Sequence, residues 1–211
     1  MAKNSVSTGS LIFRTIYVTL GVIATLDCTG FFYREYNGDW FVYYTNLSNI
    51  ICIGVMLLSL IAEARGKGNI LPRFRFYVLV MILVTFFVYN FLLADDKTFY
   101  TYVTDIDCTL FHFVLPLMYF ADWIFFCKRK CLKVFDPLFS TIMPLVYVGF
   151  ILVRAQLITI TSDTLVYPYF FLDLDNLGVA GFLSWIGVLL GVFVALGYLL
   201  FAFDRTKLGR K

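Results

Sequence analysis

The chain has 211 residues, of which 61% are hydrophobic and only 15% are charged, with a formal net charge of +3 and a mean hydropathy of +0.84. Soluble domains are nearer half apolar and a quarter charged, so this composition excludes an ordinary soluble protein. The basic residues stand in short stretches between apolar runs, which excludes a nucleic-acid-binding face. We therefore expect an all-α membrane protein whose single domain covers residues 1–211.

A membrane-spanning helix needs about 20 mostly apolar residues. Six runs meet this requirement, and the connections between them are too short for a soluble domain. The first ten residues lack the basic start and cleavage site of a signal peptide, so the first run is expected to be a retained helix. The sequence therefore predicts a bundle of six transmembrane helices at about 11–33, 41–63, 74–94, 108–127, 137–157 and 179–203.

Lysine and arginine predict the orientation of the bundle. One side holds both termini and Lys3, Arg14, Arg65, Lys67, Arg73, Arg75, Lys128, Arg129, Lys130, Lys133, Arg205, Lys207, Arg210 and Lys211. The other side has only Arg34, Lys97 and Arg154 as bases, together with the acids Glu35, Asp39, Asp95, Asp96, Asp105, Asp107, Asp163, Asp173 and Asp175. Because basic residues favour the cytoplasmic side, we expect both termini to be cytoplasmic.

The second run begins with the polar stretch Thr45-Asn46-Leu47-Ser48-Asn49. Thr45, Ser48 and Asn49 stand at positions i, i+3 and i+4, so they share one face of a helix. At about 1.5 Å rise per residue, the other expected helices bring further polar groups to nearly the same depth, close to the outer surface. These are Asp27, Asn90, His112 and Arg154. Since polar groups in lipid usually face the bundle interior, the shared depth predicts one buried polar site.

His112 is the only histidine of the chain and is a candidate general base. Pro116 has no N–H to donate to the carbonyl of His112, so the helix should loosen there and leave that carbonyl free. A Thr45 hydroxyl beside this imidazole would form a minimal activated nucleophile. The alternative is that the histidine only packs between helices and that the threonine bonds back to its own helix.

Several neighbouring groups are candidates for supporting roles. Four polar side chains could either donate hydrogen bonds to an oxyanion or form hydrogen bonds between helices. They are those of Asn46, Ser48, Asn49 and Asn90. Arg154 is a candidate for holding a substrate carboxylate. Asp27 is a candidate for orienting His112 or for pairing with Arg154.

We expect Asp122 and the cysteines to lie outside this site. Asp122 lies about 15 Å deeper than His112, so a neighbouring helix or the basic stretch 128–130 is its expected partner. With one histidine, no paired cysteine spacing and aspartates scattered over loops, we expect neither a metal nor a cofactor.

The stretch from Val166 to Asp175 is too aromatic for a plain solvated turn. We expect it to fold back over the outer end of the bundle as a cap or pocket wall, with Tyr167 and Tyr169 as candidate substrate-binding residues. An interfacial aromatic belt is the alternative.

Three short stretches, taken in order, carry a family resemblance. They are Tyr43-Tyr44-Thr45, then His112 followed after three residues by Pro116, then Val166-Tyr167-Pro168-Tyr169-Phe170. This order resembles the androgen-induced protein family, which includes the androgen-dependent TFPI-regulating protein, and the short outer loops resemble its bacterial six-helix members. The resemblance implies an intramembrane threonine hydrolase that cleaves fatty acid esters of hydroxy fatty acids, with Thr45 as nucleophile and His112 as its histidine.

The expected function is therefore hydrolysis of single-chain lipid esters. The partners would be membrane lipids and an ester substrate that enters from the bilayer. The expected location is the bacterial cytoplasmic membrane, or the endoplasmic reticulum or plasma membrane in an animal. The alternative is a non-catalytic protein that binds lipid or carries a small solute, although a carrier would place its polar groups nearer the bilayer midplane.

Overall fold

The computed structural model describes residues 7–68, 70–94, 100, 102, 104–158 and 165–206. Within these ranges the chain is helical and contains no strand. Six helical segments are long and apolar enough to cross a membrane: Thr8–Cys28, Tyr44–Ala64, Pro72–Leu93, Ile106–Phe126, Asp136–Leu157 and Leu174–Arg205. The prediction of a six-helix membrane protein is confirmed at this level. Of the charges used to predict orientation, Lys3, Asp95, Asp96, Lys97, Asp163, Lys207, Arg210 and Lys211 lie outside the described residues.

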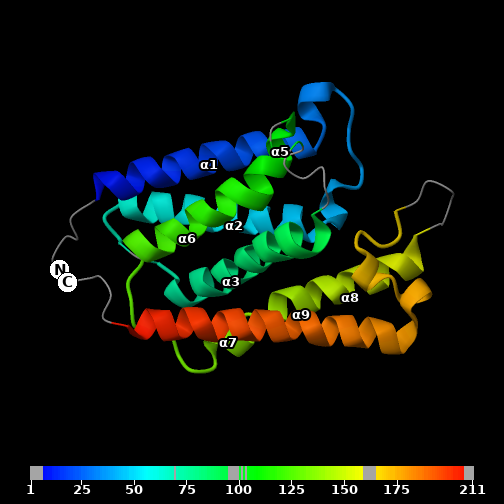
Figure 1. Cartoon of the computed structure of the whole chain (residues 1–211). Coiled ribbons are helices and arrows are strands. Elements are labelled where there is room, and N and C mark those ends of the chain that lie inside the picture. The colour runs from blue at the N-terminus through cyan, green and yellow to red at the C-terminus, as the bar shows by residue number, and fades with distance from the viewer. Residues whose placement is uncertain are drawn as a thin grey trace.

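The helices form two groups (Figure 1). In the first group α1 (Thr8–Cys28), α2 (Tyr44–Ala64), α3 (Pro72–Val88) and α6 (Leu115–Phe126) lie side by side. In the second, the long α9 (Leu174–Arg205) packs on α3 and α7 (Asp136–Phe139), and α8 (Ile142–Leu157) lies along it. We call the end where α1 begins and α9 ends the inner end of the bundle, and the opposite end the outer end.

The central helix is α3, which is apolar on every side between Val78 and Val84 and is almost completely buried there. A helix without a polar face is typical of a fully enclosed position. A second apolar cluster closes the outer end, where the short 3₁₀ turn Phe170–Leu172 packs on α8 and α9. Its buried members are Val42, Tyr147, Ile151, Phe171, Leu172 and Phe182.

One predicted helix boundary is wrong for a local reason, and another falls at a break in the helix. The first helix was expected to reach residue 33 but ends at Cys28, because Gly30 adopts a left-handed conformation with φ of 79°. A Cβ atom there would stand 1.7 Å from the carbonyl oxygen of Glu35, so the turn requires glycine. The last helical segment opens with a short turn from Leu174, where the Asp173 carboxylate accepts the backbone N–H of Asn176 at 3.0 Å. Gly178, with φ of 63° and ψ of 172°, interrupts the helix, and the uninterrupted helix begins at 179, as predicted.

A buried ion cluster joins four helices, α1, α2, α3 and α6, at the inner half of the bundle. Asp122 on α6 accepts a hydrogen bond from Arg14 Nε of α1 at 2.8 Å and another from Arg75 Nη2 of α3. Glu63 of α2 stands 3.8 Å from Arg14. Of the two partners expected for Asp122, a neighbouring helix is therefore correct, and the basic stretch 128–130 is not the partner.

Candidate active site

The polar residues at the start of α2 share one buried face, as their spacing predicts. Thr45 is 7% exposed, and Ser48 and Asn49 are 1% and 0% exposed. The Ser48 hydroxyl donates to the carbonyl of Thr45 at 2.9 Å and lies 3.2 Å from the hydroxyl of Thr85 on α3. The Asn49 amide donates to the carbonyls of Thr45 and Phe111, at 2.9 and 3.1 Å. Ser48 and Asn49 are thus engaged in bonds within and between helices.

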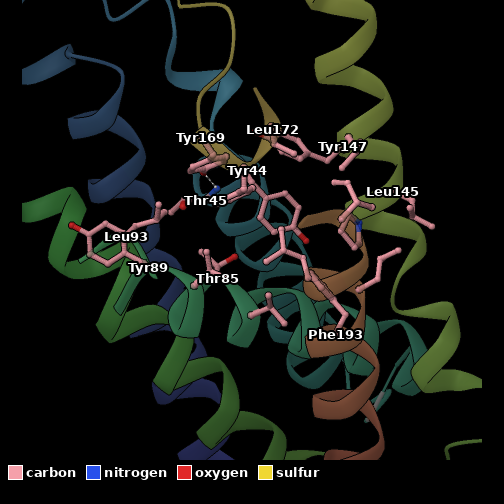
Figure 2. Close-up of a pocket in the computed structure, with 18 residues that line it drawn as sticks. Tyr44, Thr45, Thr85, Tyr89, Leu93, Leu145, Tyr147, Tyr169, Leu172 and Phe193 are labelled. Atoms are coloured by element: carbon pink, nitrogen blue, oxygen red, sulfur yellow. Dashed lines mark hydrogen bonds between the residues drawn. The ribbon is translucent and has the colours of Figure 1, made fainter. Parts of the chain in front are cut away.

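Thr45 stands in the wall of an apolar pocket near the outer end. Figure 2 shows its side chain between Tyr169 and Thr85. The space between the lining side chains is about 660 Å³ when the open mouth is included. The cavity proper is only about 70 Å³. The pocket is therefore a narrow slot between the two groups of helices, lined by Tyr44, Thr45, Val84, Thr85, Val88, Tyr89, Leu93, Pro144, Leu145, Tyr147, Val148, Tyr169, Phe171, Leu172, Ile186, Leu189, Leu190 and Phe193.

The aromatic stretch before α9 forms the roof of this pocket, so the prediction of a pocket wall is confirmed. The Tyr169 hydroxyl accepts a long hydrogen bond, 3.5 Å, from the backbone N–H of Thr45. The Tyr169 ring stacks on Phe171, with ring centroids 5.1 Å apart, and meets Tyr43 edge-on. Burial raises the pKa of Tyr169, although its hydrogen bonds with Thr45 and Tyr44 oppose the shift. The phenol is therefore neutral near pH 7 and can donate as well as accept.

His112 lies in a π-helical turn, η4 (Leu110–Val114), that directly precedes α6. The loosening predicted from Pro116 is confirmed, and the carbonyl of His112 accepts the Asn90 side-chain amide at 3.3 Å. Its Nδ1 lies 3.1 Å from the carbonyl oxygen of Cys108. Because a carbonyl oxygen only accepts, this contact favours the neutral tautomer with the proton on Nδ1, which leaves a lone pair on Nε2.

His112 does not line the pocket that holds Thr45. Among the hydrogen bonds of the described residues none links the two side chains. Tyr89 contacts both features: it lines the pocket, and its ring stacks on the imidazole with centroids 3.5 Å apart and planes inclined by 19°. Tyr89 begins a second π-helical turn, η3 (Tyr89–Leu93), which follows α3. The sequence did not single out Tyr89, although its stacking partner was a candidate.

The remaining candidates lie around the pocket without lining it. Asn46 donates to the carbonyl of Trp40 at 2.8 Å, which closes the turn before α2. Asn90, besides its bond to His112, accepts from the Tyr102 hydroxyl at 2.6 Å. Tyr167 is partly buried in the apolar cluster of the outer end. These three residues hold backbone and loops in place.

Arg154 and Asp27 do not take the positions expected of them. Arg154 Nη1 donates to the carbonyls of residues 165 and 166, at 2.7 and 3.1 Å, and its Nη2 lies 3.6 Å from Asp39. The guanidinium thus holds the roof stretch and does not line the pocket. Asp27 accepts the backbone N–H of Asp107 at 3.2 Å, and among the described residues no hydrogen bond or ion pair joins it to His112 or Arg154.

The expectation that the aspartates are scattered is also wrong at this point. One carboxylate oxygen from each of Asp27, Asp105 and Asp107 lies within 4.8 Å of the others, because the start of α5 (Ile106–Thr109) packs on the end of α1. Three such oxygens are hard ligands of the kind that Ca²⁺ or Mg²⁺ accepts. The expected absence of a metal stays a prediction.

Compared with known proteins, the chain matches no family model, no curated protein and no solved structure. Its class therefore rests on the fold and the pocket alone. Six apolar helices, and a narrow apolar pocket with hydroxyl groups in its wall, define a multi-pass membrane protein with an internal pocket.

Proposed function

We propose that this chain is an intramembrane hydrolase of single-chain lipid esters, with Thr45 as nucleophile and His112 as general base. The observation that carries the proposal is the threonine hydroxyl in the wall of a narrow, apolar pocket. Such a slot accepts an acyl chain and excludes bulk water, and the hydroxyl meets the ester at the chain's polar end. The family resemblance favours fatty acid esters of hydroxy fatty acids as substrates.

In the proposed reaction the Thr45 oxygen attacks the ester carbonyl while its proton passes to Nε2 of His112. The tetrahedral intermediate collapses to an acyl-threonine, and the leaving alkoxide takes the proton from the imidazole. Water, deprotonated by His112, then attacks the acyl-threonine and releases the fatty acid and the Thr45 hydroxyl. Tyr89 lines the pocket and stacks on His112, so we expect its ring to shift when the imidazole engages Thr45.

The position of Thr45 in the first turn of α2 supports this role. The first N–H groups of a helix have no partner within the helix, and the helix dipole places partial positive charge there. The N–H of Thr45 has only the long bond to the Tyr169 hydroxyl. That N–H and the neutral phenol are the proposed donors to the oxyanion.

The orientation with both termini in the cytoplasm belongs to the same proposal. It is supported by the basic residues at the inner end of the bundle, among them Arg65, Arg73, Lys128 and Lys133. The pocket would then lie under the outer leaflet of a bacterial cytoplasmic membrane, and a substrate would enter it sideways from the lipid.

The decisive experiment is ester hydrolysis by the purified protein in detergent. A fatty acid ester of a hydroxy fatty acid and a simple monoacyl ester are compared for wild type, Thr45→Ala and His112→Ala. Both variants should lose turnover by at least about a hundredfold. Thr25→Ala is a matched control, because its hydroxyl bonds to the carbonyl of Gly21 on α1, outside the pocket. Activity that survives Thr45→Ala would exclude Thr45 as the nucleophile.

A non-catalytic lipid-binding protein is the second candidate. The observation that favours it is the absence of a hydrogen bond between Thr45 and His112 among the described contacts. An active-site-directed fluorophosphonate separates the two functions, because only an activated hydroxyl forms the covalent adduct. Adduct at Thr45 that disappears in His112→Ala supports the hydrolase, and a protein that binds lipid but never forms the adduct supports the second candidate.

A further inference from the structure

One arginine at the inner end of the bundle has no hydrogen-bond or ion-pair partner among the described residues. The guanidinium carbon of Arg129 lies 4.4 Å from the centre of the Trp123 ring on α6 and 4.7 Å from that of Phe203 on α9. None of the ion pairs of the described residues includes this guanidinium. Cation–π attraction to the two rings therefore holds an arginine whose hydrogen-bond donors are unused.

Only one nitrogen of this guanidinium can meet a ligand. Nε and Nη1 are closed off from solvent without a partner, whereas Nη2 is not, and the residue as a whole is partly exposed. Arginine stays charged at neutral pH and donates well to phosphate oxygens. Burial lowers the pKa of Arg129, and the nearby Asp204 opposes this shift, so an anion at Nη2 would further stabilise the charge.

The surroundings of Arg129 are strongly basic. Four further bases, all exposed, stand in the loop after α6 and at the end of α9: Lys128, Lys130, Lys133 and Arg205. Asp204 is the one acid in the stretches 128–133 and 204–205. It is 2% exposed, and one of its carboxylate oxygens accepts the backbone N–H of Lys130 at 3.0 Å. Five bases against one buried acid leave this end of α6 and α9 with an excess of positive charge.

Apolar surface on the deeper side of Arg129 favours a lipid over a soluble phosphate. Leu199 lies one turn before Phe203 on the same face of α9 and is 69% exposed. On α6 the Phe120 ring stacks on Trp123, with centroids 6.3 Å apart, and is only partly buried. A phosphate at Arg129 would therefore have apolar side chains beside it on the side toward which the acyl chains of a phospholipid extend.

We propose that an anionic phospholipid binds at the inner ends of α6 and α9, where its phosphate accepts a hydrogen bond from Nη2 of Arg129. The exposed lysines around the site favour a headgroup with a net negative charge over a zwitterionic one. The acyl chains would lie along Leu199 and Phe120. This site is at the opposite end of the bundle from the pocket of Thr45, so the inference holds whether or not the chain hydrolyses an ester.

Native mass spectrometry of the detergent-purified protein tests the proposal. Phosphatidylglycerol and phosphatidylcholine with the same acyl chains are titrated in parallel, and the first phosphatidylglycerol should bind about tenfold more tightly. Arg129→Gln should abolish most of this preference. Arg65→Gln is the matched control, because it removes one exposed positive charge at the inner end, just after α2 and away from the Trp123 and Phe203 rings, and it should keep the preference. Glycerol phosphate, the soluble part of the headgroup, should not displace the lipid.

A photo-crosslink gives a second measurement that needs no variant. Phosphatidylglycerol with a diazirine in its acyl chain should label the wild-type peptide that contains Leu199, and phosphatidylcholine with the same diazirine should label it less. If Arg129→Gln fails to fold, this crosslink decides. Equal affinity for the two lipids, equal loss of preference in Arg129→Gln and Arg65→Gln, displacement by glycerol phosphate, or labels confined to other peptides would each overturn the inference.

Discussion

Replacing Asp122 by asparagine should strongly destabilise the protein. Asp122 is 1% exposed and accepts hydrogen bonds from two arginines, Arg14 and Arg75, that are each 1% exposed. With Glu63 nearby, the cluster contains two positive and two negative charges. Asparagine keeps the shape of the side chain but leaves one positive charge uncompensated between α1, α3 and α6.

The size of the effect follows from the burial. Removing one partner of a buried ion pair costs about 3–5 kcal/mol, because the remaining charge stays desolvated. For a chain of this length, 1 kcal/mol corresponds to a change of about 2–4 °C in the midpoint. The expected loss for Asp122→Asn is therefore about 6–20 °C.

The assay is thermal unfolding of the purified protein in detergent, followed by tryptophan fluorescence. Glu63→Gln is the matched control from the same cluster. Its carboxylate is 3.8 Å from Arg14 and 14% exposed, and glutamine can still accept the backbone N–H of Ser7, so about 1 kcal/mol or less is expected. Equal midpoints for Asp122→Asn and wild type would refute the reasoning, because the buried arginines would then need no counter-charge.

Two further predictions concern the turn after α1 and the orientation of the bundle. Gly30→Ala should destabilise by more than about 1 kcal/mol, because φ is 79° and the new Cβ meets backbone. Gly54→Ala, in open space on α2, should stabilise by up to about 1 kcal/mol, and equal thermal midpoints for the two variants would contradict this. A membrane-impermeant maleimide should label the partly exposed Cys131 in inside-out vesicles only, since the other cysteines are buried and burial raises the pKa of the Cys127 thiol to about 12. Labelling of Cys131 on intact cells would reverse the proposed orientation.

The six helices could be predicted because a membrane span has a simple signature of length and apolar composition. Helix ends depend on single residues within a few positions of the boundary. Gly30 ends α1 in a left-handed turn, and Gly178, also with positive φ, interrupts α9 just before its long apolar run. Such signals are short and common, so an apolar run alone places a boundary only to within a turn or so.

In the candidate site too, features set by nearby residues could be predicted from the sequence, and contacts between distant residues could not. The shared face of Thr45, Ser48 and Asn49 follows from helical spacing, and it is observed. The stacking of Tyr89 on His112 and the convergence of Asp27 on the start of α5 join distant parts of the chain. No local pattern specifies which turn of one helix meets which turn of another, so these contacts could not be predicted from the sequence.

The backbone of η4 gives a structural reason for two of the polar residues at this depth, Asn49 and Asn90. In this π-turn the N–H of Leu115 bonds to the carbonyl of Leu110, and Pro116 has no N–H to offer. The carbonyls of Phe111 and His112 therefore lose their usual helical donors. The amides of Asn49 and Asn90 replace those donors from α2 and η3.

This arrangement separates the two asparagines from the chemistry. Each amide compensates a carbonyl that would otherwise be buried without a donor, so neither is needed as an oxyanion donor. Alanine at Asn49 or Asn90 would expose one unpaired carbonyl and would act first on stability. The hydroxyls of Thr45 and Tyr169 meet in the wall of the pocket, and the proposed chemistry rests on them.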